Sequence, residues 1–403
     1  MRGKSFCPYC YHRIPLRKLW YQCNGRGSNK REGCRAESSD EARAREFKYT
    51  AKLRPSYGPP RFRPTRAPRQ GTCPDCGGVS GIRVCPNCHT PLPPGFEDSR
   101  SPLIAMIGAK NTGKTVYLTV LANELRTSLR RRFQADVRLT ADLQDDQESS
   151  LQRLDKQIEL LYHKRTLLDF TRSAAENDGR RDALVFEWRQ ARRRRLAGTH
   201  LRTTYLSFYD TAGEDLSSRA NTVELKYLDA AEALIVLLDP FMLPQARDRL
   251  HVPKEAINGQ PIMEVLGNVT DTLRESRRIG NRRIDLPVAV VFAKIDAFFE
   301  ALGSDHRLLN PPDSSTGYYD ETAGRDTHED VRALLDDFGA DAVDTHLTAH
   351  YRDFRYFAVS ALGAQPDYRG AAVESGGVRP FRVDEPLLWL LSRFGVVPSR
   401  ERK

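Results

Sequence analysis

Gly108-Ala109-Lys110-Asn111-Thr112-Gly113-Lys114-Thr115 is the stretch on which the fold prediction rests. The apolar residues 102–107 before it predict a short buried strand, and residues 116–130 after it predict a helix. A strand, a glycine-containing loop and a helix, in that order, are typical of a phosphate-binding loop, whose backbone N–H groups surround a phosphate. In such a loop Lys114 neutralises phosphate charge and the Thr115 hydroxyl binds Mg²⁺. The alternative is an ordinary glycine turn.

Further apolar runs predict the other strands of a parallel sheet. Residues 233–238, 286–292 and 356–359 are short and apolar, as expected of strands covered on both faces. Residues 262–273 have helical periodicity, and residues 386–394 predict a closing helix. Because strands alternate with helices, we predict an α/β protein with a doubly wound, mostly parallel sheet of the P-loop NTPase type, preceded by small zinc-stabilised modules.

Two segments interrupt this alternation. Residues 136–168 carry leucine and isoleucine at helical spacing and predict a long helical insertion that extends to about residue 170. The insertion either carries partner specificity or packs on the core as a surface addition. Residues 183–188 and 201–209 predict the two strands of an antiparallel hairpin, joined by residues 192–198.

The 403-residue chain has a formal charge of +10, much of it in the first hundred residues and in Arg189 to Arg195. This charge permits contact with nucleic acid, an anionic membrane surface or an acidic partner, but a basic run is also typical of a solvated face. The first twenty residues lack the apolar core of a signal peptide, and residues 233–238 are too few to cross a bilayer. We therefore expect a cytoplasmic protein without a membrane span.

All eight cysteines lie between Cys7 and Cys88, and such clustering in the cytosol indicates metal rather than disulfides. A Cys-x-x-Cys knuckle points two thiolates at one ion. The spacing predicts one zinc site made by Cys73, Cys76, Cys85 and Cys88, and a second made by Cys7, Cys10, Cys23 and Cys34. With four sulfur ligands, one or two Zn²⁺ ions would be structural and needed for folding. The alternatives are disulfides, free thiols, or His12 as a substitute ligand.

These features divide the chain into consecutive parts. Residues 1–50 are predicted to form a cysteine-rich zinc module, residues 51–70 a Pro- and Arg-rich linker, and residues 71–95 a zinc ribbon. The P-loop domain is predicted to cover residues 100–395, followed by a tail at residues 396–403.

Four motifs at strand ends resemble those of Ras-like GTPases of the translation-factor class, and the resemblance covers roughly residues 100–395. The motifs are Gly108–Thr115, Asp210–Gly213, Lys294 with Asp296, and Ser360–Leu362. The cysteine-rich front end, with Val331-Arg-Ala-Leu-Leu before Phe357-Ala-Val-Ser-Ala-Leu-Gly363, looks like the bacterial double-GTPase proteins of conflict and defence gene clusters.

The resemblance implies how a guanine nucleotide would be held. Asp296 would accept hydrogen bonds from guanine, Lys294 would lie along the base, and the Ala361 N–H, between Ser360 and Leu362, would reach the guanine oxygen. The GTP phosphates would be bound by the loop and the start of the following helix, from Gly108 to Val116. Mg²⁺ would be bound by Thr115 and Asp210, with Thr171 as the candidate first-switch threonine.

Hydrolysis would involve Lys114, Gly213 and Glu214. Two residues depart from the pattern of the resembled family. Ala293 stands where Asn or Thr is usual, which weakens guanine selectivity. Glu214 stands where a water-orienting Gln is common, and a carboxylate beside a triphosphate makes hydrolysis slow or dependent on a partner.

The implied function is a GTP-binding molecular switch with slow or partner-stimulated GTPase activity in a bacterial defence or signalling system. Its partners would be proteins, with a second GTPase as one candidate. Two other functions stay open: a nucleic-acid-associated P-loop ATPase or adaptor with zinc ribbons, and a non-hydrolysing pseudo-GTPase scaffold. Nucleic acid is the less favoured partner because the cysteine-rich segments have few interleaved aromatic residues.

Overall fold

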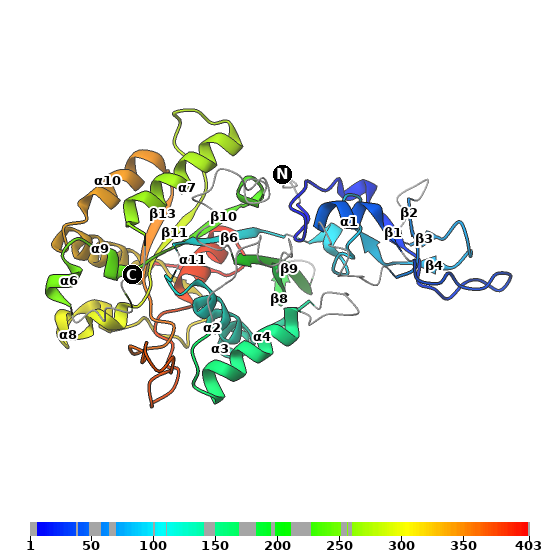
Figure 1. Cartoon of the computed structure of the whole chain (residues 1–403). Helices are drawn as coiled ribbons and strands as arrows, with labels where there is room; N and C mark the ends of the chain where they lie inside the picture. Colours follow the sequence, from blue (N-terminus) through cyan, green and yellow to red (C-terminus); the bar gives the residue numbers. More distant parts are fainter. Residues whose placement is uncertain are drawn as a thin grey trace.

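A seven-stranded sheet forms the centre of the computed structural model, with the strand order β13-β11-β10-β6-β9-β8-β7 (Figure 1). The structure describes residues 6–37, 39–47, 58–63, 70–99, 101–109, 111–140, 150–168, 183–194, 198–210, 227–250, 256 and 260–401. The strands of the sheet are β6 (Leu103–Gly108), β7 (Ala135–Leu139), β8 (Ala183–Arg194), β9 (Gly198–Asp210), β10 (Ala233–Leu238), β11 (Val288–Phe292) and β13 (Phe354–Ala358). Strands β13, β11, β10, β6 and β9 are parallel, whereas β8 runs antiparallel to both of its neighbours, β9 and β7.

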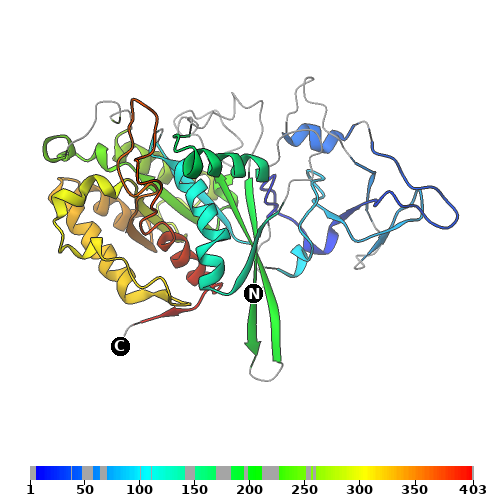
Figure 2. The same cartoon turned by 90° about the horizontal axis from the view of Figure 1, so that it is seen from below.

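Helices cover both faces of this sheet (Figures 1 and 2). Along β6, Ala105 and Ile107 belong to the hydrophobic core on one face, and Ile104 and Met106 to the core on the other. The first core is closed by α7 (Ile262–Arg277), α9 (Glu321–Asp337) and α10 (Asp341–His350). The second is closed by α2 (Lys114–Arg126), α3 (Ser128–Arg132), α4 (Ser150–Ile158) and α11 (Glu385–Arg393).

Smaller elements complete the α/β part of the chain. They are the short helices α6 (Ala246–Arg249) and α8 (Phe299–Leu302), and the parallel pair β12 (Tyr319–Asp320) and β14 (Ser399–Arg400). No helix among the described residues is both long enough and apolar enough to cross a membrane. The predicted α/β class with a mostly parallel sheet is confirmed, and the apolar runs predicted as buried strands are buried along their whole length in β10 and β11.

The predicted helix at residues 136–168 is wrong in its first part, where the chain forms strand β7. Ala135 and Val137 are buried while Asp136 and Arg138 are more exposed, which is the period of two that a half-buried strand requires. Helix α4 begins at Ser150 and continues as a π-helical turn at Glu159–His163. Because this insertion buries Leu154 and Leu161 in the core beside α2, it packs on the fold.

The predicted hairpin is present and longer than expected. Cross-strand pairs run from Ala183↔Tyr209 to Arg194↔Gly198, so most of the segment predicted as a connection belongs to the strands. Strand β7 pairs with β8 only as far as Gln190, and β6 pairs with β9 only from Ser207 onward. The far ends of β8 and β9 therefore extend past the sheet as a two-stranded ribbon (Figure 2).

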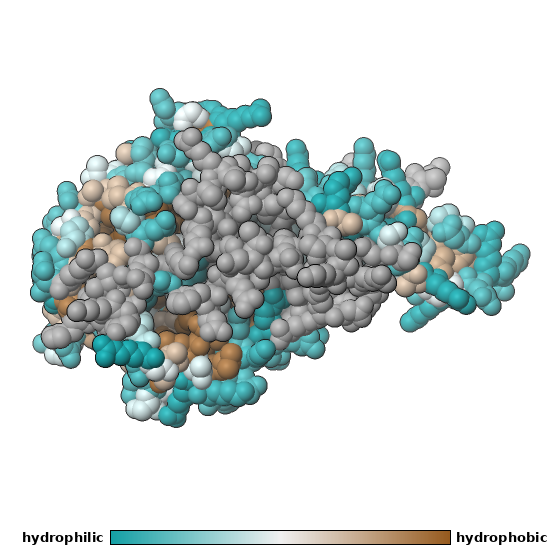
Figure 3. All heavy atoms as spheres, viewed as in Figure 1, coloured by the Kyte–Doolittle hydropathy of each residue, from teal (hydrophilic) through white to brown (hydrophobic). Residues whose placement is uncertain are grey.

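The cysteine-rich end is built around β1 (Trp20–Gln22). This strand pairs antiparallel with β2 (Arg61–Phe62) on one side and with β5 (Arg83–Val84) on the other. A second small pair, β3 (Gly71–Thr72) with β4 (Val79–Ser80), and helix α1 (Glu41–Phe47) complete it. Hydrophilic residues predominate on its described surface in Figure 3. Since β2 lies inside the predicted linker 51–70 and pairs with β1, at least this part of the segment is folded.

Candidate functional site

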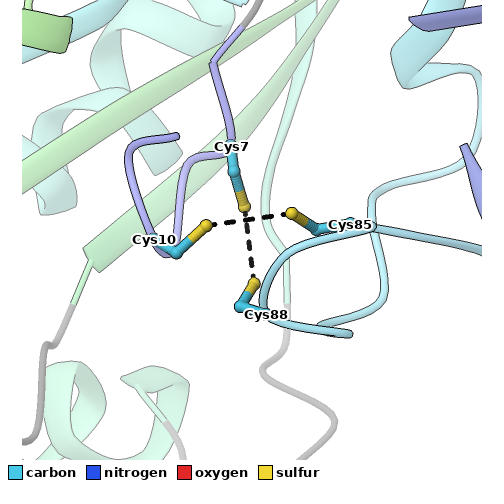
Figure 4. Close-up of side chains that lie close together, drawn as sticks. All are labelled: Cys7, Cys10, Cys85 and Cys88. Carbon is cyan, nitrogen blue, oxygen red and sulfur yellow. Dashed lines mark hydrogen bonds between the residues drawn. The ribbon is translucent and has the colours of Figure 1, made fainter. Parts of the chain in front are cut away.

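Four cysteine thiols converge next to the central sheet (Figure 4). Cys7 and Cys10 come from the first knuckle of the chain and Cys85 and Cys88 from the last, and all four side chains are buried. The sulfur atoms of Cys7 and Cys88 lie 3.8 Å apart, as do those of Cys10 and Cys85. We call this group the inner cluster.

A second group of four thiols lies among β1, β2, β3 and β4, and we call it the outer cluster. Its members are Cys23, Cys34, Cys73 and Cys76. The sulfur separations are 3.5 Å between Cys23 and Cys76 and 3.9 Å between Cys34 and Cys73. Backbone N–H groups of Gly25 and Gly78 donate to the sulfurs of Cys23 and Cys76, which is the tight turn that a metal knuckle needs.

Both clusters have the geometry of a tetrahedral zinc site. Zn–S bonds of about 2.3 Å at tetrahedral angles place the sulfur atoms roughly 3.8 Å apart. The four sulfur–sulfur separations, between 3.5 and 3.9 Å, agree with that value. The thiols of each cluster are close enough to share one ion, and four sulfur ligands would leave no position for water or substrate. The clusters could therefore bind Zn²⁺ as structural sites.

Burial and hydrogen bonds within the clusters shift the pKa values of several thiols. Burial raises the pKa of Cys7 and of Cys88, whereas a hydrogen bond from Cys7 lowers the pKa of Cys10. In the outer cluster, the backbone N–H of Gly78 is the main cause that lowers the pKa of Cys76 to about 6. A bound cation would favour the thiolate form of all four sulfurs, which is why metal binding to such a site releases protons.

The structure groups the cysteines differently from the sequence-based prediction. That prediction placed Cys7 and Cys10 with Cys23 and Cys34, and treated the last four cysteines as a separate ribbon. In the structure each cluster combines two of the first four cysteines with two of the last four, and the outer cluster is nested inside the inner one along the chain. Spacing along the sequence identifies each knuckle, but it does not tell which knuckles share an ion. That depends on the fold, because strand β1 pairs with both β2 and β5 and so brings distant segments together.

Polar residues surround the inner cluster and tie it to α1. The Asn87 side-chain amide contacts the Cys10 sulfur at 3.5 Å and donates to Glu46 at 3.0 Å. His12 lies 3.4 Å from Glu46 and 3.0 Å from the Asn87 amide nitrogen, beside the four thiols rather than among them. His12 was only an alternative to the cysteine ligands, and the four thiols complete the inner cluster without it. It lies close to Cys10 and Glu46, in the surrounding shell that orients ligands.

Aromatic residues join the inner cluster to the central sheet. Val185 of β8 and Tyr205 of β9 share one hydrophobic core with the four cysteines. The Tyr205 hydroxyl lies 2.6 Å from the Pro94 carbonyl oxygen and 2.9 Å from a Glu187 carboxylate oxygen. Because the four cysteines, Val185 and Tyr205 share one buried core, the cysteine-rich end is docked on the sheet rather than attached by a loose linker.

The predicted phosphate loop follows β6 and precedes α2, as expected from the sequence. Gly113 begins α2 with a φ of 87°, a conformation that favours glycine, and a Cβ at Gly108 would meet the Leu237 carbonyl oxygen at 2.8 Å. The Lys114 side chain is buried and donates to the carbonyl oxygens of Gly108 and Ala109 at 2.8 and 2.7 Å. The ammonium group is therefore folded back over the loop.

Residues that follow other strands meet this loop at the carboxyl edge of the sheet. The Lys294 ammonium lies 2.6 Å from a carboxylate oxygen of buried Asp239 and donates to the Asn111 carbonyl at 2.9 Å. Burial raises the pKa of Asp296, although a hydrogen bond with Ser360 and the charge of Lys294 act in the opposite direction. Ala361 and Leu362 pack against the second core.

Two residues of this edge were missed by sequence reasoning. Asp239 follows β10 and pairs with Lys294; its only sequence signal is an Asp-Pro dipeptide after an apolar run. Burial raises the pKa of Tyr368, and the charges of Asp239 and Asp296 act in the same direction. No motif marks Tyr368 in the sequence.

Some predicted residues cannot be compared with the structure. Lys110, Thr171, Gly213 and Glu214 lie outside the described residues, and of Asp210 the structure describes only the backbone, as the last residue of β9. The structure thus brings together the loop, Lys294, Asp296 and Ser360, while the expected magnesium ligands stay predictions. No feature of the described residues specifies guanine or Mg²⁺.

No family model matches the sequence. The chain is 29% identical over 422 aligned residues to a Mycolicibacterium smegmatis protein named "Putative ESX-1 scaffolding and assembly protein SaeC". The alignment covers 98% of this chain and 100% of the relative. The similarity therefore runs through the cysteine-rich end and the α/β part together.

This similarity corrects the functional expectations drawn from the sequence. The relative, aligned over its full length, is named for scaffolding and assembly, whereas the motif resemblance covered only residues 100–395. The assignment to translation-factor-class or double-GTPase proteins is wrong, and so is the GTP-binding switch in a defence system. The nucleic-acid-associated ATPase and the pseudo-GTPase do not match the relative either. A loop that resembles a phosphate-binding motif does not by itself define a function, since the same fold hosts many.

Proposed function

We propose that this chain is a scaffolding protein that brings together the protein components of an ESX-1-type assembly. The observation that carries the proposal is the similarity to the M. smegmatis protein, which spans both chains almost completely. A scaffold needs a rigid body with more than one accessible face. The docked cysteine-rich end and the α/β part supply such a body, because Tyr205, Pro94 and Glu187 fix one to the other.

Complementation tests this role. The chain would be expressed in M. smegmatis lacking its relative, and ESX-1 complexes would be quantified by native electrophoresis and mass spectrometry. In parallel, a tagged copy would be purified from its own host at native expression level. Recovery of the complexes in the first experiment, or stoichiometric co-purification of ESX-1-type components in the second, supports the proposal. A chain that accumulates normally but does neither is not a scaffold of this assembly.

We propose that the inner and outer clusters each hold one structural Zn²⁺. The proposal is supported by the sulfur–sulfur separations and by the burial of seven of the eight cysteines. A segment with so small a hydrophobic core needs a bound ion to fold. Purified protein is expected to contain about two zinc ions per chain. Chelation is expected to unfold the cysteine-rich end. Full retention of its circular dichroism and proteolytic resistance after complete zinc removal would contradict a structural role.

We also propose that the loop at residues 108–115 holds a phosphate-bearing ligand as part of the scaffold. The geometry that supports this is the buried Lys114 ammonium, whose two carbonyl contacts a phosphate would replace. Calorimetric titration of the full chain with ATP, GTP and pyrophosphate is the direct test. Lys114→Ala is expected to abolish binding, whereas Lys164→Ala, which removes an exposed ion pair with Glu159, is expected to leave it unchanged. Equal binding by wild type and Lys114→Ala would remove the loop from consideration.

A further inference from the structure

The ends of β8 and β9 form a ribbon that no part of the proposed function has used. We call the residues Arg189–Arg194 and Gly198–Arg202 the basic arm. Cross-strand pairs within the arm run from Gln190↔Arg202 to Arg194↔Gly198, and Arg189 at its base pairs with Thr203. Among the described strands, β7 reaches β8 only up to Gln190 and β6 begins to pair with β9 only at Ser207. Figure 2 shows the two strands running beyond the body of the fold.

The register places the arm's residues on two faces. Cross-strand neighbours share a face, and successive residues alternate between faces. One face therefore carries Ala191 opposite Leu201, with Arg193 opposite Thr199 on the tip side and Arg189 on the body side. The other face carries Arg192 opposite His200, and Arg194 opposite Gly198. An apolar pair thus lies between two arginine positions along one face of the ribbon.

Charge and exposure on the arm are both unusual. Residues 189–202 include arginines at 189, 192, 193, 194, 195 and 202, and no aspartate or glutamate. Arg189 is paired with Glu187 on the body side of the arm, and Arg202 donates to the Gly395 carbonyl. Leu201 is 71% exposed, more than the other large apolar side chains that the described surface exposes, Val79, Ile82 and Met263.

We propose that the basic arm docks an extended acidic segment of a protein partner. Such a segment would lie along the outer edge of β9 and place an apolar side chain beside Leu201, with carboxylates on either side of it. Arginine suits this role because its planar guanidinium forms paired hydrogen bonds with a carboxylate. A two-stranded ribbon is marginal on its own, and a third strand would bury Leu201 and use the open backbone edge. The inference names a partner chemistry for the proposed scaffold and rests on that role.

The arm fits a peptide better than the other anionic partners. Residues 189–202 contain no Phe, Tyr or Trp, so the arm lacks the stacking platforms of single-stranded nucleic-acid binders and the aromatic anchors of membrane-surface segments. The open edge of a strand pairs only with another peptide backbone. A phosphate backbone also offers no apolar group that could contact the exposed Leu201 between the two basic positions.

Fluorescence anisotropy with the full chain tests the docking of such a segment. The probe is a labelled twelve-residue peptide that repeats the sequence Glu-Ser-Leu-Ser three times. Arg192→Glu/Arg193→Glu is expected to weaken binding at least about tenfold, and Leu201→Ser about threefold. The matched controls are Arg282→Glu/Arg283→Glu in the turn between α7 and β11, and Met263→Ser on α7; both are expected to bind as the wild type does. Equal thermal unfolding midpoints establish that the variants are folded.

Three results would overturn the docking proposal. One is the absence of peptide binding by the wild type, which would mean that the arginines only protect the strand edge from aggregation. Another is the same loss in the control variants as in the arm variants. The third is tighter binding of single-stranded DNA, RNA or phosphatidylserine vesicles than of the peptide.

A second measurement separates this inference from the scaffolding role. The tagged wild type and the Arg192→Glu/Arg193→Glu variant are purified from the native host and compared for recovered partners. If the wild type recovers them and the variant recovers as much, the arm proposal fails while the scaffold stands. If the wild type recovers none but the peptide still binds at the arm, the scaffold fails and the arm stands.

Discussion

Asp40 shows how one carboxylate holds several parts of the cysteine-rich end. Its oxygens lie 3.0 Å from His89 Nδ1 and 3.4 Å from an Arg61 nitrogen, and one accepts the Arg43 backbone N–H at 3.0 Å at the start of α1. Burial on its own would raise the pKa of Asp40, but the hydrogen bonds from His89 and Arg43 and the charges of His89 and Arg61 lower it below its ordinary value. The ionised form is therefore the one that the fold stabilises.

Substitution of Asp40 by Asn keeps an acceptor for the Arg43 N–H but removes the negative charge that faces Arg61 and His89. It is expected to lower the free energy of unfolding of the zinc-loaded protein by about 1–2 kcal/mol at pH 7. A lowered folded-state pKa contributes stability above the unfolded pKa of about 3.9 and loses it as the pH falls through the folded pKa. The difference between variant and wild type should thus be constant near neutral pH and shrink below about pH 4. Urea unfolding at several pH values measures it, with exposed Asp98→Asn as the control that should change nothing.

At the scale of elements, the contact between the cysteine-rich end and the sheet depends on a strand residue. Tyr205 of β9 is buried between the inner cluster and the sheet, where its hydroxyl meets Pro94 and Glu187. Burial raises the pKa of this hydroxyl, so it stays a neutral donor at all ordinary pH values. Strand β9 therefore belongs to both parts of the molecule.

Tyr205→Phe keeps the ring and removes only the hydroxyl. It is expected to cost about 1–3 kcal/mol because the two acceptors that share this hydroxyl proton, the Pro94 carbonyl and the Glu187 carboxylate, lose it. Limited proteolysis should then release the cysteine-rich end faster, while the α/β part keeps its secondary structure. Tyr318→Phe, on a half-buried tyrosine near β12, is the matched control. Unchanged proteolysis of the Tyr205 variant would mean that apolar packing alone holds the two parts together.

Sequence patterns predicted elements well where burial is two-sided and poorly where it is not. Strands β10 and β11 were predicted because every residue in them is apolar. Strand β7 was missed because Asp136 and Arg138 resemble the polar side of a helix until the neighbouring strand β8 is known. The edge residue Asp239 was missed for a similar reason: its partner Lys294 lies 55 positions away in the numbering, and only the folded chain brings the two together.

At the scale of the whole molecule, the cysteine pairing makes an unusual prediction about metal content. Cys7 and Cys88 belong to one cluster, so Cys7→Ser/Cys88→Ser is expected to lose one zinc ion and keep the other. Cys7 and Cys23 belong to different clusters, so Cys7→Ser/Cys23→Ser is expected to lose both. Consecutive pairing along the chain predicts the reverse for each variant. Inductively coupled plasma mass spectrometry of the two purified variants distinguishes the two arrangements.

The nested clusters also determine how the cysteine-rich end would respond to a broken backbone. Each cluster takes two thiols from before Phe47 and two from after Gly58. A single protease cut between those residues would leave two fragments that remain joined by two zinc ions, because each ion would bind two sulfur atoms from each fragment. The nicked protein should elute as one species from a size-exclusion column, and its fragments should separate only when a chelator is added. The cysteine-rich end would then stay folded without an unbroken backbone.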